Sequence, residues 1–109
     1  MDQQLIRQGD VALVPVGALP EGLTEVPRDN GRLVLAYGEV TGHSHVIDAP
    51  DEEATLLTTE EGERFLRIVG RAAPLVHEEH SAITVAPGLY RLPPQVEFND
   101  GMEPLRVLD

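Results

Sequence analysis

Cysteine is absent from the 109 residues of this chain. Its absence excludes disulfide bonds and metal sites built from thiolates. A chain without cysteine suits a reducing compartment, so we expect a cytoplasmic protein. Any metal site must then be built from nitrogen and oxygen ligands.

Positive charge is scarce, because lysine is absent and the eight arginines are outnumbered by 19 acidic residues. The net charge is therefore −11. Phosphate binding normally needs a basic face, so we do not expect a nucleic-acid partner. The closely spaced Arg64, Arg67 and Arg71 form a local basic group. We interpret this group as the solvated face of a strand, since most surface charges only interact with water.

A long apolar run is also missing from the start of the chain. The first ten residues, MDQQLIRQGD, are polar and charged, and they resemble neither a secretory signal nor a membrane span. We therefore expect no membrane partner. The overall composition is 41 % hydrophobic, which suits a globular protein, and the length suits a single domain over residues 1–109.

Helical periodicity with capping residues is not found in the chain. Short apolar stretches, some of them alternating, are instead separated by glycine and proline, which is typical of strands and turns. A loop or wide hairpin is expected over 17–32, with a turn at Asn30-Gly31, and a connection or bulge is expected at Gly38 and Gly42. The expected strands are 9–16, 33–40, 43–47, 55–59, 64–70, 74–77, 81–86, 88–92 and 95–98, with 104–108 as a closing strand or a short helical end. The pattern predicts an all-β fold, a small single-domain barrel or sandwich of short, mostly antiparallel strands.

All four histidines fall in two short clusters. His43 and His45 lie in the stretch GEVTGHSHVI, and His77 and His80 enclose the stretch HEEH. On a strand, residues i and i+2 point to the same face, so His43 and His45 would project together. Two such imidazoles can both reach one ion, at about 2.0–2.1 Å for zinc.

The HEEH stretch allows two arrangements. In a turn, His77 and His80 come to one side, whereas in an extended strand His77 faces the same way as Glu79, and Glu78 the same way as His80. An imidazole and a carboxylate converge in both cases. Glu78 and Glu79 are therefore candidate catalytic residues, since a carboxylate near a bound ion can ligate it, orient an imidazole or act as a general base for a bound water.

We expect the two histidine pairs to meet in the folded chain and to bind a divalent transition metal ion. A nitrogen and oxygen ligand set suits Zn, Fe, Mn, Ni or Cu and does not choose among them. The alternative interpretation is that the histidines lie on the surface and only form hydrogen bonds.

Three functions are compatible with these residues, and the sequence does not decide whether the protein is an enzyme. The first is a metal-dependent hydrolase that acts through a metal-bound water. The second is a non-catalytic homo-oligomeric binding or scaffold module, with histidines at a subunit interface or a shared small-molecule site, because open sheet edges need cover. The third is a metal-independent nuclease in which two histidines act as acid and base, although the negative net charge would repel its substrate.

Four stretches of the chain carry a resemblance to a known family: RQGDV, LAYGEVTGHSH, LVHEEHSAI and APGLYRL. Together they resemble a family of small bacterial and phage-associated proteins of unknown function, in which a GEVTGHxH segment precedes an HEEH segment. The resemblance runs from about Arg7 to the C-terminus, and it implies that the two histidine clusters belong to one site.

A looser resemblance is to cupins, small β-barrels that hold a metal with an HxH pair, a later glutamate and a later histidine. His43 and His45 match the pair. Asp48 comes too early and Glu52 too late to match the glutamate, and no histidine follows Pro87-Gly88. The cupin metal motif therefore does not carry over as a whole.

Overall fold

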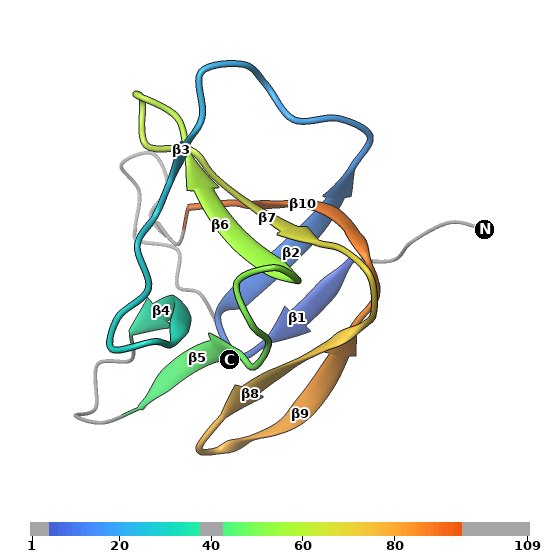
Figure 1. Cartoon of the computed structure of the whole chain (residues 1–109). Coiled ribbons are helices and arrows are strands. Elements are labelled where there is room, and N and C mark those ends of the chain that lie inside the picture. The colour runs from blue at the N-terminus through green and yellow to red at the C-terminus, as the bar shows by residue number, and fades with distance from the viewer. Residues whose placement is uncertain (1–4, 38–42, 95–109) are drawn as a thin grey trace, which may run out of the picture.

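A computed structural model describes residues 5–37 and 43–94 of the chain, and its described residues form strands and turns (Figure 1). The strands are β1 (Ile6–Gln8), β2 (Val11–Val16), β3 (Thr24–Glu25), β4 (Leu33–Tyr37), β5 (Ser44–Ile47), β6 (Ala54–Thr58), β7 (Arg64–Ile68), β8 (Ala73–His77), β9 (His80–Val85) and β10 (Gly88–Leu92). One sheet has the order β1-β2-β10-β7-β6-β3 and the other β4-β5-β8-β9. Neither sheet closes into a barrel over these residues, so the predicted all-β fold of short antiparallel strands is confirmed, with two open sheets.

The two sheets share one apolar core. Its fully enclosed side chains include Leu13 and Leu66 from the first sheet and Leu35, Leu75 and Val85 from the second, each 0 % exposed. Each large aliphatic side chain buried in this way stabilises the fold by about 1.5–3 kcal/mol. The core therefore holds the two sheets together and fixes the positions of the strands that carry the histidines.

The first hairpin of the chain departs from the prediction. A single strand was expected over 9–16, but β1 and β2 pair antiparallel, with Gln8 opposite Val11 and a turn at Gly9 and Asp10. Gly9 has a φ of +60°, a left-handed conformation that glycine adopts without steric cost. The strand β1 has only one apolar residue in three, so no alternation marks it.

Other turns follow the sequence closely. Asn30 and Gly31 have φ values of 54° and 82°, and Asp29 bridges Arg32, so the predicted turn is confirmed. The predicted hairpin of β6 and β7 is likewise confirmed, with Thr58 opposite Arg64. The short strand β3 lies inside the expected loop over 17–32.

Some predictions fall on parts of the chain that lie outside the described residues. These are the expected strands at 95–98 and 104–108 and the connection marked by Gly38 and Gly42. Among the residues that are described, none forms a helix that is long and apolar enough to cross a membrane.

Tyr90 on β10 provides a test of the core. Its ring is 1 % exposed, and its hydroxyl donates a hydrogen bond to the carbonyl of Ala86 over 2.7 Å. We expect Tyr90→Phe to lower the free energy of unfolding by about 0.5–1.5 kcal/mol, the usual contribution of one such bond. Urea denaturation at pH 8 measures this loss.

The same residue should make stability depend on alkaline pH. Burial raises the pKa of Tyr90 above the value of about 10 expected in the unfolded chain. The unfolded state therefore loses its proton first, so this contribution to stability is complete below about pH 10 and is lost as the pH rises through the folded-state pKa. Tyr90→Phe should show a smaller loss of stability between pH 9 and pH 11 than the wild type, and an equal loss would contradict this assignment.

Candidate functional site

The HEEH stretch forms the turn of a hairpin. Strand β8 ends at His77, strand β9 begins at His80, and Glu78 and Glu79 form the turn between them. His77 and His80 are paired across the hairpin, and their ring centroids are 4.7 Å apart. Of the two arrangements that the sequence allows, the structure therefore has the turn, and both imidazoles lie on one side.

The first histidine pair lies beside this hairpin. His45 belongs to β5, which is the neighbour of β8 in the sheet, and His43 comes directly before β5. The ring of His77 lies 5.7 Å from that of His43 and 4.2 Å from that of His45, and His45 lies 5.9 Å from His80. The predicted meeting of the two pairs is confirmed, whereas a role for these residues as metal ligands stays a prediction.

Gln8 orients the ring of His45. This glutamine is 3 % exposed, and its side-chain nitrogen donates to the carbonyls of Leu75 and Ser81, each over 2.9 Å. Its oxygen then faces Nδ1 of His45 at 2.8 Å. An amide oxygen only accepts, so Nδ1 carries the hydrogen, and the neutral ring of His45 has its lone pair on Nε2.

An irregularity in the sheet explains why a glutamine is needed at this point. Leu75 pairs with Ile83 and His77 pairs with His80, so β9 contains one more residue than β8 over this interval. Such a bulge disrupts the regular ladder and leaves backbone groups without strand partners. The amide of Gln8 bonds the carbonyl of Ser81 within the bulge, and it thereby ties β1 to the histidine hairpin.

The tip of the β1–β2 hairpin packs against the histidine rings. A Cβ atom added to Gly9 would lie 2.8 Å from Nε2 of His80 and 3.1 Å from Cε1 of His45. The next residue, Asp10, has Oδ1 at 3.5 Å from Nε2 of His45, a contact that is an ion pair only when the ring is protonated. Asp10 is therefore a carboxylate of the cluster, in addition to the two that the sequence analysis names.

Glu78 connects the hairpin turn to β5. Its Oε1 accepts a hydrogen bond from the backbone N–H of Ser44 over 3.0 Å. This bond favours the ionised carboxylate and lowers the pKa of Glu78, with smaller contributions from its own N–H and from His43 and His77. Glu78 thus has a clear structural role, and its catalytic role stays a prediction.

Glu79 contacts a histidine of each pair. Its Oε2 lies 3.5 Å from Nδ1 of His43, and its backbone N–H donates to Nδ1 of His77 over 3.0 Å. Since Nδ1 of His77 accepts this bond, the hydrogen of its neutral ring lies on Nε2. His45 and His77 therefore have opposite tautomers, one with a lone pair on Nε2 and the other with a hydrogen there.

Sequence reasoning missed Gln8, Gly9 and Asp10, which surround the rings from the first hairpin. The stretch RQGDV contains all three, and it is one of the segments that carry the family resemblance. A glutamine before a Gly-Asp turn is an ordinary surface pattern, however. Only the fold shows that this turn reaches residues that are far away in the sequence.

These features define a small all-β protein with four imidazoles and several carboxylates gathered where β1, β5 and the β8–β9 hairpin meet. A family model described as a domain of unknown function (DUF8820) matches residues 7–95, and the chain belongs to this family. No curated protein and no solved structure matches the chain significantly. Membership of a family of unknown function was expected, and the cupin resemblance is not confirmed.

Proposed function

We propose that the histidine cluster binds one divalent transition metal ion, with His45, His77 and His80 as the central ligands. The observation that carries this proposal is the spacing of the three rings, whose centroids lie 4.2, 4.7 and 5.9 Å apart. A tetrahedral ion with nitrogen ligands at about 2.0–2.1 Å holds imidazole centroids roughly 5 Å apart. The three observed separations lie on both sides of this value, which supports a shared ion after small movements of the rings.

The nitrogen and oxygen atoms that would ligate the ion are not arranged around one point in the structure. Within the described residues, no group of three or more His, Asp or Glu side chains is arranged to hold an ion as it stands. The tautomer of His77 gives a reason, because its Nδ1 accepts the N–H of Glu79 and its Nε2 carries the hydrogen. To ligate an ion through Nε2, the neutral ring of His77 would carry its hydrogen on Nδ1 instead, which would break the bond from the N–H of Glu79 and let the ring rotate.

The carboxylates around the rings are candidates for two roles, a further ligand of the ion and a base toward a bound water. The carboxylate of Asp10 lies 3.5 Å from His45, and that of Glu79 lies 3.5 Å from His43. Either can complete the ligand set, together with His43, or act as a base toward a water on the ion. We propose hydrolysis as the reaction of such a site, on the condition that one coordination position stays open to water. The nitrogen-rich donor set suits Zn, Fe, Ni or Cu, with Mn favoured only if the carboxylates dominate.

A second candidate function needs no metal. The opposite tautomers of His45 and His77, held by Gln8 and by the N–H of Glu79, place a proton acceptor and a proton donor on neighbouring rings. Such a pair can act as general base and general acid. Acid–base chemistry on a phosphodiester therefore stays as the alternative proposal.

Elemental analysis of untagged full-length protein, combined with its native mass, tests the metal proposal. We expect one transition metal ion per chain, and we expect His45→Ala and His80→Ala to reduce this content at least about tenfold, since each removes a central ligand. Glu61→Gln, in the turn between β6 and β7, is the control and should keep the metal. The native mass gives the oligomeric state, which tests the binding-module alternative.

Protein that contains no metal and takes up neither Zn²⁺ nor Co²⁺ would contradict the metal proposal and favour the acid–base pair. Full metal content in both folded alanine variants would contradict the assignment of the ligands. Far-UV circular dichroism shows whether each variant keeps its β structure.

A further inference from the structure

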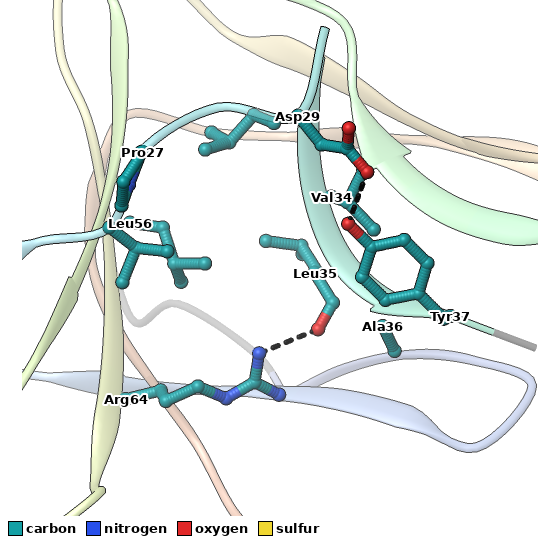
Figure 2. Close-up of a pocket in the computed structure, with 10 residues that line it drawn as sticks. Pro27, Asp29, Val34, Leu35, Ala36, Tyr37, Leu56 and Arg64 are labelled. Atoms are coloured by element: carbon teal, nitrogen blue, oxygen red, sulfur yellow. Dashed lines mark hydrogen bonds between the residues drawn. The ribbon is translucent and has the colours of Figure 1, made fainter.

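A pocket of about 330 Å³ lies away from the histidines, between β4, β6 and the segment before β4 (Figure 2). Its walls include the apolar side chains of Val26, Pro27, Leu33 and Leu56. Figure 2 shows the side chain of Arg64 reaching from β7 along one side of the pocket, toward Leu35. The volume is at the lower end of the range for small-molecule sites, about 300–1,000 Å³.

Arg64 is not the solvated strand residue that its sequence context indicates. It is half-buried, and its Nη1 donates to the carbonyl of Leu35 over 2.7 Å, while burial lowers the pKa of its guanidinium. The described part of the chain gives Arg64 no carboxylate partner, although Arg28 pairs with Asp51 and Arg71 with Glu53. A partly desolvated cation without a counterion is costly.

The opposite side of the pocket limits the charge of an occupant. Tyr37 donates its hydroxyl hydrogen to Oδ2 of Asp29 over 2.6 Å, so a carboxylate stands at this side (Figure 2). A dianion such as a phosphate monoester would be repelled by Asp29 and would find one cation for two charges. A single negative charge is matched by the single guanidinium.

We propose that this pocket binds a small monocarboxylate with an apolar body. The carboxylate accepts hydrogen bonds from the guanidinium of Arg64, whose planar fork suits a carboxylate group. The apolar body lies against Val26, Pro27, Leu33 and Leu56. This site shares no residue with the histidine cluster, so it does not depend on the metal proposal.

Calorimetric titration with octanoate tests the proposal, with octanamide as the neutral ligand of the same body. Octanoate should bind the wild type at least about tenfold more tightly than octanamide, because the guanidinium supplies a charge-assisted bond. Arg64→Met should lower octanoate affinity by about the same factor and leave octanamide binding unchanged. Arg67→Met, an exposed arginine on the same strand, is the matched control and should bind octanoate as the wild type does.

Equal binding of octanoate and octanamide by the wild type would overturn the proposal, as would no octanoate binding at millimolar concentration. An equal loss of octanoate affinity in Arg64→Met and Arg67→Met would also overturn the proposal, because such a result would show a general effect of net charge. The comparison of the two ligands on the wild type decides the matter even if Arg64→Met does not fold.

Discussion

Replacing Gln8 by leucine should lower the free energy of unfolding by about 2–4 kcal/mol and weaken metal binding about 10–100-fold. Leucine is apolar and one bond shorter than glutamine, so it cannot bond the carbonyls of Leu75 and Ser81 or Nδ1 of His45. The loss of stability arises from buried polar groups left unpaired, each of which costs about 1–3 kcal/mol. The loss of affinity arises because His45 is no longer held in one tautomer and one orientation.

Gln8→Glu separates these two effects. A glutamate keeps an acceptor for Nδ1 of His45 but has no N–H for the two carbonyls, so stability should fall while metal affinity falls less than in Gln8→Leu. Urea denaturation and competition for Zn²⁺ with a chromophoric chelator measure the two quantities. Wild-type stability and affinity in Gln8→Leu would show that this amide does not position the histidine.

Gly9→Ala should cost about 2–4 kcal/mol of stability, of which about 1–2 kcal/mol comes from the left-handed backbone and the rest from overpacking. The added Cβ would lie 2.8 Å from Nε2 of His80, closer than normal contact allows. His80 must move away, so we also expect metal affinity to fall about tenfold. Thermal and urea denaturation give the first effect, and zinc competition gives the second.

Gly22→Ala is the matched control for this substitution. Gly22 has a similar φ of +79°, but a Cβ atom built there meets nothing within 4 Å. The control should lose only the backbone contribution and keep its metal affinity. If both variants lose the same stability and bind Zn²⁺ as the wild type does, the first hairpin does not restrain the histidines.

The fold class could be predicted because its signals are local. Glycine and proline mark the turns, Asn30-Gly31 among them, and alternating apolar residues mark strands such as β2. The strand β1 was missed because three residues with one apolar side chain give no periodicity. The pairing of strands that are distant in sequence, such as β2 with β10, is decided by the packing of the whole core.

The candidate site, like the fold, was predictable only where its signals are local in the sequence. The spacing of His43 and His45 and the turn-like HEEH stretch are local patterns, and both proved informative. The contact of Gln8 with His45 spans 37 residues, and its bond to Ser81 spans 73. Local patterns cannot show such contacts, and they also failed for Arg64, since spacing on a strand does not tell which face is covered.

X-ray absorption at the zinc edge of the zinc-loaded full chain tests most directly whether imidazoles from both histidine pairs ligate one ion. The account predicts nitrogen scatterers at about 2.0–2.1 Å, with the multiple scattering of at least three imidazole rings. One ring should be lost in His80→Ala and one in His45→Ala. A spectrum with oxygen ligands only, or with imidazoles of one pair only and no change in His80→Ala, would contradict the account.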